Sequence, residues 1–248
     1  MTPITTETSG RVVGGLFLSA FALYGGGSAL IKTATRGNTA LPENAASLGR
    51  LSTGATLMLA NSAVVAGIGV LASRALRRRA RRSAQIYLGT RTAEATLLAL
   101  APASTLCLVA LARRGAETSD GAGPAVDALA RAAVENSEST YWVAMAALGL
   151  GSVPFCRTLL NSALLPRPLA AWGMVGYAIF AAGSALQLAG LKVGLALSVP
   201  GGLFELAAGI YLLVNGFGPS RPTDTHVLNA HAPIPTGPTA VASAGAGG

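Results

Sequence analysis

Long apolar runs alternate with short polar segments along this chain. Six of these runs are roughly 20 or more residues long and carry at most two charged side chains each, and about 20 apolar residues in a helix span the hydrocarbon core of a bilayer. The pattern predicts an all-α fold, a polytopic integral membrane bundle of six transmembrane helices. The predicted spans are residues 12–31, 51–73, 86–112, 141–165, 169–191 and 195–217.

The segments outside the spans predict two tails and one long connection. Residues 1–11 form a short polar tail, residues 12–217 form the six-helix transmembrane domain, and residues 218–248 are rich in Pro, Ala, Thr and Gly. That last composition cannot bury a core and predicts a disordered tail. The longest connection, 113–140, is acidic, and its residues 125–134 are predicted to form a short surface helix.

Several residues inside the spans predict local geometry. Pro102 and Pro154 should kink the third and fourth helices, because proline lacks a donor and clashes with the preceding turn. Tyr141 and Trp142 begin the fourth span and fit an aromatic belt at the membrane surface. Glycines along the first and fifth spans let helices approach closely, which permits a homo-oligomer without requiring one.

Composition agrees with a membrane protein and narrows its partners. The chain is 51% hydrophobic and 11% charged, with a mean hydropathy of +0.53, whereas soluble domains are about 25% charged. A net charge of +8 indicates either nucleic acid or anionic lipid as partner. Because the arginines cluster between apolar runs, we predict the lipid bilayer and its anionic headgroups, and no nucleic acid.

A dense arginine run between the second and third spans predicts the orientation. Six spans place both termini on the side of this run, and positive charge gathers on the cytoplasmic side of span ends. We therefore expect both termini to be cytoplasmic, in a bacterial cytoplasmic (plasma) membrane. The run is interpreted first as this topology signal and second as a contact site for anionic lipid. The lipid-contact candidates are Arg77, Arg78, Arg79, Arg81 and Arg82.

Four ionisable residues lie inside the spans, where each costs roughly 2.5–3.5 kcal/mol unless it is paired or faces water. Arg91 and Glu94 are three residues apart and can pair on one helix face. A pair between Glu94 and Arg157 is feasible, because both lie at similar depth in the cytoplasmic half. Glu205 lies deeper and can reach Arg157 or lie beside Asn61, itself predicted to hydrogen-bond between helices.

Three interpretations of this polar cluster stay open. In the first, the cluster lines a cavity that handles a small ligand, ion or proton of unknown identity, since intramembrane ionisable residues are functional candidates by default. In the second, the buried ion pairs only hold helices together in a non-catalytic scaffold or partner-binding protein. In the third, the protein is a membrane-embedded enzyme. The third is least supported, because the spans contain no His or Asp, and we predict no catalytic residue.

Cysteine and histidine positions predict neither a metal site nor a cofactor. Cys107 and Cys156 lie within apolar runs and are expected to be small buried hydrophobic residues. His226 and His231 both lie beyond the last span. A haem or metal held by histidine inside the membrane is therefore not expected.

Three stretches together resemble a bacterial family of polytopic membrane proteins, that of the domain of unknown function 4386 (DUF4386). The resemblance covers residues 11–218 and implies six spans and residence in the cytoplasmic membrane, and it implies no activity. Pro168, the Ala/Gly-rich spans and the short connection between the second and third spans depart from the family pattern and leave the implied topology unchanged. The stretches are Arg91-Thr-Ala-Glu94, Leu164-Leu-Pro-Arg167 with Leu169 and Gly173, and Pro200-Gly-Gly-Leu-Phe-Glu205 through Tyr211-Leu-Leu-Val-Asn-Gly216.

Overall fold

The computed structural model describes residues 6–35, 44–77, 79–117, 124–191 and 193–218. Within these residues the chain forms six α-helices and one short 3-10 helix, with no strand. The helices are α1 (Thr6–Ala34), α2 (Ala45–Leu76), α3 (Arg81–Glu117), α4 (Pro124–Ser162), α5 (Arg167–Leu188), η1 (Gly194–Ser198) and α6 (Val199–Asn215).

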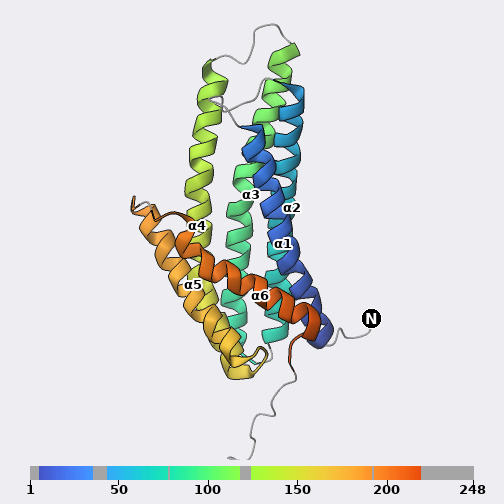
Figure 1. The fold of residues 1–248 in the computed structure, drawn as a ribbon, viewed down its shortest axis with the longest axis vertical. Helices are drawn as coiled ribbons and strands as arrows, with labels where there is room; N and C mark the ends of the chain where they lie inside the picture. Colours follow the sequence, from blue (N-terminus) through green and yellow to red (C-terminus); the bar gives the residue numbers. More distant parts are fainter. Residues whose placement is uncertain (1–5, 36–43, 78, 118–123, 192, 219–248) are drawn as a thin grey trace, which may run out of the picture.

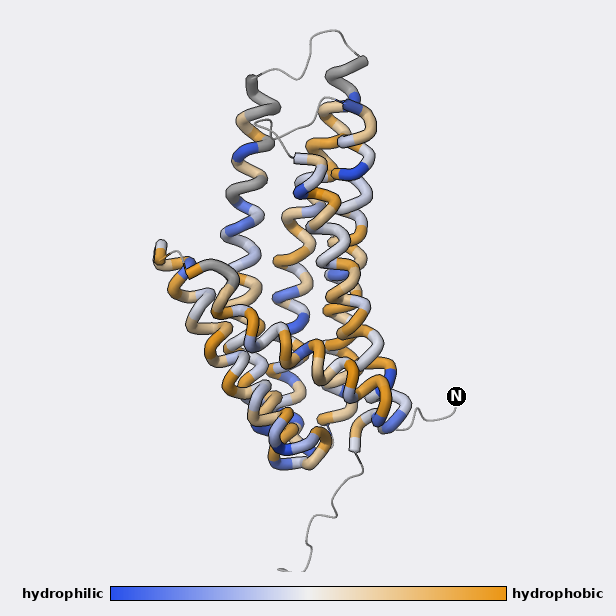
Figure 2. Tube along the Cα trace, viewed as in Figure 1, coloured by the Kyte–Doolittle hydropathy of each residue, from blue (hydrophilic) through white to orange (hydrophobic). Residues whose placement is uncertain are grey.

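Six segments of the described chain are long and apolar enough to cross a membrane, one in each of α1 to α5 and the last, Ala196–Asn215, across η1 and α6. Large apolar side chains also point outward, including Leu150, Val175 and Val214, and apolar residues recur along all six helices (Figure 2). Such side chains are favourable against acyl chains and unfavourable against water. The predicted all-α, multi-pass membrane fold is confirmed.

The helices form a closed ring in chain order. Each helix packs against the next, and α6 returns to pack against α1. Helices α1 to α4 stand side by side along the long axis, whereas α5 and α6 cross the lower half of the bundle obliquely (Figure 1). The start of α1, the end of α6, the α2–α3 connection and the α4–α5 connection all lie at the lower end. A ring of this kind places the inward faces of all six helices around one central space.

Glycines allow the closest helix crossings in this ring. A Cβ atom on Gly14 of α1 would lie 2.6 Å from the carbonyl oxygen of Gly209 in α6. A Cβ atom on Gly27 of α1 would lie 2.8 Å from the carbonyl oxygen of Gly54 in α2. Real Cβ atoms do not approach an oxygen this closely, so both crossings require a residue without a side chain.

The first two helices begin earlier than the apolar pattern predicts. Residues 6–11, expected within the polar tail, form the first turns of α1, where Arg11 Nη2 and Glu7 Oε1 are 2.8 Å apart one turn along the helix. Helix α2 begins at Ala45, where Asn44 Oδ1 accepts a hydrogen bond of 2.7 Å from Ser47 N. Ion pairs and caps extend a helix beyond its apolar part, which hydropathy does not register. Residues 1–5 and 219–248 of the predicted tails lie outside the described residues.

The predicted surface helix 125–134 is not a separate element. It is the first part of α4, which runs without interruption from Pro124 to Ser162, because no proline lies between Ala125 and Val153. Helices α3 and α4 also continue through Pro102 and Pro154, and the kinks expected there stay predictions.

The aromatic belt expected at Tyr141 and Trp142 is wrong. Trp142 is buried, and Tyr141 lines an internal cavity. The prediction placed these residues at the start of a membrane helix, where side chains meet the surface. In the structure α4 extends more than four turns before them, and the Tyr141 ring stacks on Tyr24 of α1 while Trp142 lies edge-on to Tyr141.

Candidate functional site

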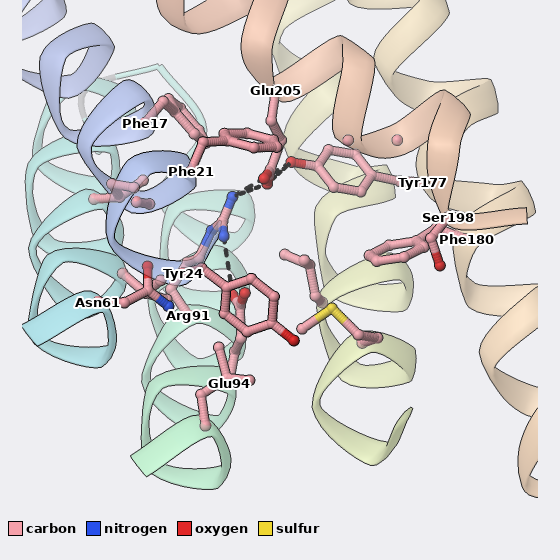
Figure 3. A pocket seen from close by; sticks show the side chains of 18 of the residues that line it. Phe17, Phe21, Tyr24, Asn61, Arg91, Glu94, Tyr177, Phe180, Ser198 and Glu205 are labelled. Carbon is pink, nitrogen blue, oxygen red and sulfur yellow. Dashed lines mark hydrogen bonds and ion pairs between the residues drawn. The ribbon is translucent and has the colours of Figure 1, made fainter. Parts of the chain in front are cut away.

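Arg91 of α3 lies at the centre of a buried polar cluster and is only 1% exposed. Its Nη1 donates a hydrogen bond of 2.9 Å to Glu94 Oε2, and its Nη2 donates one of 2.6 Å to Glu205 Oε1 on α6 (Figure 3). Its Nε donates to the hydroxyl oxygen of Tyr87 at 2.8 Å. One guanidinium thus holds two carboxylates and a phenol, with the directional geometry that a planar fork of donors provides.

The cluster extends to α5 and α1 through aromatic residues. The Tyr177 hydroxyl of α5 donates to Glu205 Oε1 at 2.6 Å, and Arg91 Nη2 lies 3.3 Å from the same hydroxyl oxygen. The guanidinium carbon lies 5.4 Å from the ring centre of Phe17 in α1 and 5.3 Å from that of Tyr87. These distances fit cation–π contact. Four of the helices are therefore tied to one cation.

Local sequence spacing explains why three of these side chains meet. Tyr87, Arg91 and Glu94 are separated by four and three positions, so they lie on one face of α3. Gly69 of α2 lets the backbone of that helix approach this face, since a Cβ atom there would lie 2.6 Å from Arg91 Cβ. The buried face of α3 is thus polar over about two turns and apolar beyond them.

A cavity of about 280 Å³ adjoins the cluster, and side chains from all six α-helices and from η1 line it. Arg91, Glu94 and Glu205 form its charged wall. Aromatic residues make up only 5% of the chain, yet six of them line this cavity. They are Phe17, Phe21, Tyr24, Tyr141, Tyr177 and Phe180, and all but Tyr141 are labelled in Figure 3.

Asn61 of α2 also lines the cavity (Figure 3). Asn61 is only 3% exposed, and its Oδ1 has no hydrogen-bond partner among the described residues. A buried polar atom without a partner costs free energy. Asn61 therefore supplies unused hydrogen-bonding capacity in the cavity wall.

The cavity reaches the outer surface of the bundle near α1 and the start of α6. Phe21 and Val199 line it and are also 40% and 51% exposed. Helices α1 and α4 are not neighbours in the ring, and the rings of Tyr24 and Tyr141 bridge them by stacking, with ring centres 6.0 Å apart. Both rings of this pair line the cavity.

The structure brings together most of the residues predicted for the site, with one correction. Arg91, Glu94 and Glu205 form direct ion pairs, and Asn61 lines the same cavity. Arg157 is exposed on α4 and joins neither carboxylate among the described contacts. The pair between Arg157 and Glu94 was predicted because the two residues lie at similar depth along the membrane. In the structure the face of α4 that carries Cys156 and Leu159 is buried in the core, so Arg157 points away from Glu94.

Two members of the cluster were absent from the sequence-based prediction. Tyr87 could have been found, since it precedes Arg91 by four residues, the spacing of neighbours on a helix face. Tyr177 could not, because it lies in an apolar span and its pairing with Glu205 depends on how α5 and α6 cross. When a tyrosine and a carboxylate lie on different helices, their separation in the sequence gives no indication that they form a hydrogen bond.

The arginine run lies at the lower end of the bundle, from the C-cap of α2 at Arg77 into the first turn of α3 at Arg81 and Arg82 (Figure 1). Arg77, Arg81 and Arg82 are exposed, as lipid contact requires. Arg79 is partly buried, and its Nη1 has no partner among the described residues. Arg78 lies outside the described residues. Their contact with anionic lipid stays a prediction.

The described residues contain no group of three or more His, Cys, Asp and Glu side chains placed to hold a metal ion. His226 and His231 lie outside those residues. Cys156 is buried, as predicted, but Cys107 is exposed. The prediction failed for Cys107 because apolar runs in a membrane helix include a lipid-facing side as well as a buried side.

Comparison with family models gives one match, to the domain of unknown function DUF4386, over residues 12–216. Comparison with curated proteins and with solved structures found no match. The family match includes Arg91, Glu94, Asn61 and Glu205 and confirms the resemblance seen in the sequence. Because it spans far more than half of the 248 residues, the chain belongs to the DUF4386 family.

Proposed function

We propose that this protein binds a small ligand or ion inside the membrane, with Arg91, Glu94 and Glu205 at the polar end of the binding site. The cavity of about 280 Å³ in contact with both carboxylates carries the proposal. This volume is several times the roughly 30 Å³ that one water molecule occupies in the liquid, and the cavity opens at Phe21 and Val199. A cluster that served only to join helices would not need a space of this size beside it.

The contacts indicate different roles for Arg91 and for the two carboxylates. Arg91 donates through all three nitrogens and is enclosed by rings, so its main role is to fix the geometry of the site. Glu205 is the more accessible carboxylate, with a side chain 16% exposed against 4% for Glu94. We therefore assign the main ligand contact to Glu205. The scaffold interpretation is the alternative, and no observation favours an enzyme.

For the membrane, we propose the bacterial cytoplasmic membrane with the arginine-rich end of the bundle in the cytoplasm. Exposed Arg77, Arg81 and Arg82 at the end that also holds both helical termini support this orientation. A C-terminal green fluorescent protein fusion should fluoresce in bacterial cells, and a C-terminal alkaline phosphatase fusion should be inactive. The opposite pair of results would reject the orientation without affecting the binding site.

The binding proposal is tested with a library of soluble fragments and the protein in lipid nanodiscs. Fragments that occupy the cavity should raise the unfolding temperature of the natural protein. Glu205→Gln should reduce that effect, and Gly202→Leu should abolish it by filling the cavity. Gly202 suits this purpose because a Cβ atom there meets nothing closer than 4.0 Å, at Phe21.

Glu138→Gln is the matched control, because Glu138 is an exposed acidic residue of α4 that does not line the cavity. It should respond to fragments as the natural protein does. If all four proteins respond alike, or if no fragment acts on any of them, the cavity is not a binding site and the scaffold interpretation gains.

A further inference from the structure

We infer that the ligand of this cavity is a monovalent organic cation with an apolar body, such as a protonated amine or a quaternary ammonium. This inference rests on the proposed binding function and names the class of ligand. It follows from the charge balance of the cavity wall, from the way Arg91 is used, and from the composition of the remaining wall.

The charge balance of the cavity is uneven. Its lining contains one cationic side chain, Arg91, and two acidic ones, Glu94 and Glu205. With both carboxylates ionised the wall carries a formal charge of −1. An uncompensated charge away from water is costly, so a single positive charge is the complement that the site lacks.

Free acceptor positions exist on the same carboxylates. Arg91 and Tyr177 donate to Glu205 Oε1, and Arg91 donates to Glu94 Oε2. Glu94 Oε1 and Glu205 Oε2 receive no hydrogen bond from the described residues. Neither of these oxygens is fully buried, so both remain accessible from the cavity. An ammonium group can therefore reach carboxylate oxygens that the protein leaves unused.

An anionic ligand does not fit this arrangement. The guanidinium of Arg91 already donates from Nε, Nη1 and Nη2. Its Nη2 makes a second hydrogen bond, to the Tyr177 hydroxyl oxygen, which leaves one of the five guanidinium N–H groups without an acceptor among the described residues. An anion would meet two carboxylates beside that single N–H group, and the rings of Phe17 and Tyr87 lie close to the guanidinium carbon. Arg91, the only cationic side chain in the lining, is thus already hydrogen-bonded mainly to groups of the protein.

The rest of the wall favours an organic cation over a bare metal ion. Six aromatic side chains line the cavity, and aromatic faces attract cations that also have an apolar surface. Calcium takes about six to eight oxygen ligands, whereas this wall offers one unused oxygen on each carboxylate and one amide oxygen. Asn61, buried with an unpartnered Oδ1, provides a further polar contact for the ligand.

Three probes of one shape test the charge of the ligand: phenylbutylammonium, phenylbutanol and phenylbutyrate. Each is measured by equilibrium dialysis against protein in lipid nanodiscs, with empty nanodiscs as the correction for partition into lipid. The ammonium should bind roughly tenfold or more tightly than the alcohol, a preference of about 1.4 kcal/mol. The carboxylate should bind more weakly than the alcohol.

Variants locate the preference in the cavity. Glu205→Gln should reduce the preference for the ammonium over the alcohol, and Glu94→Gln should do the same if Glu205→Gln does not fold. Glu138→Gln should leave it unchanged, and Gly202→Leu should weaken all three probes. Equal binding of ammonium and alcohol, or tighter binding of the carboxylate, would reject the cation while leaving a binding cavity. Binding of none of the probes would also reject it, and the fragment library would then decide whether the cavity binds anything.

Discussion

Arg91 Nη2 and Glu205 Oε1 lie 2.6 Å apart although the two residues are 114 positions apart in the chain. This contact joins the third and the last helices of the ring, and Tyr177 adds the fifth through the same carboxylate oxygen. The pair therefore closes the polar site and also fixes how the oblique helices α5 and α6 sit against α3. Under the proposed function, binding and stability would depend on the same few atoms.

Replacing Arg91 with Leu should destabilise the protein by about 3–5 kcal/mol, because it leaves two carboxylates buried without their cation. Arg91→Lys should recover only part of this loss, since one ammonium cannot replace the planar fork. Thermal unfolding in detergent measures both. Arg11→Leu is the control: its ion pair with Glu7 is more than half exposed and is worth about 1 kcal/mol or less. A loss for Arg91→Leu as small as that of the control would contradict a central role.

Tyr177→Phe should destabilise the protein by roughly 1.5–3 kcal/mol, the usual range for a hydrogen bond to a charged group. The ring would keep its edge contact with Phe204, whose centre is 5.5 Å away, so the effect isolates the hydroxyl. Tyr211→Phe should change the unfolding temperature little, because Tyr211 is a partly buried residue that packs on the core. Equal effects of the two substitutions would mean that the bond between Tyr177 and Glu205 contributes nothing.

Gly14→Ala should destabilise the contact between α1 and α6 by about 1–3 kcal/mol through overpacking, because the new Cβ atom would lie 2.6 Å from Gly209 O. Gly25→Ala in the same helix should have the opposite sign and stabilise by roughly 0.5–1 kcal/mol, since nothing lies within 4 Å of its Cβ position. Unfolding temperatures of both variants provide the comparison. An unchanged Gly14→Ala protein would show that the helices do not cross there.

Arg157→Gln should leave the polar cluster intact and change stability by no more than about 0.5 kcal/mol, as surface substitutions usually do. Arg157 is exposed, whereas Glu94 pairs with Arg91 in its own helix. Unfolding of Arg157→Gln, Glu94→Gln and the double variant forms a double-mutant cycle, which should be additive. A coupling energy above about 1 kcal/mol between the two substitutions would show that Glu94 and Arg157 do interact.

The sequence by itself determined the class of fold and the identity of the residues that need partners. Six apolar runs predict six membrane helices because hydrocarbon tolerates little other backbone structure. Arg91, Glu94 and Glu205 are conspicuous because charge is costly in that environment. The pairing of Arg91 with Glu94 was also predictable, since a spacing of three residues on a helix is local geometry.

Only the tertiary structure decided which helix faces turn inward. Depth along the membrane can be estimated from sequence, but the rotation of a helix about its axis depends on packing with its neighbours. Arg157 turned outward and Tyr141 turned inward for that reason. The contact between Arg91 and Glu205, the hydroxyl of Tyr177 and the aromatic cavity likewise exist only because the ring closes from α6 to α1. In uniformly apolar helices the sequence carries little information about rotation, because the side facing lipid and the side facing protein have similar composition.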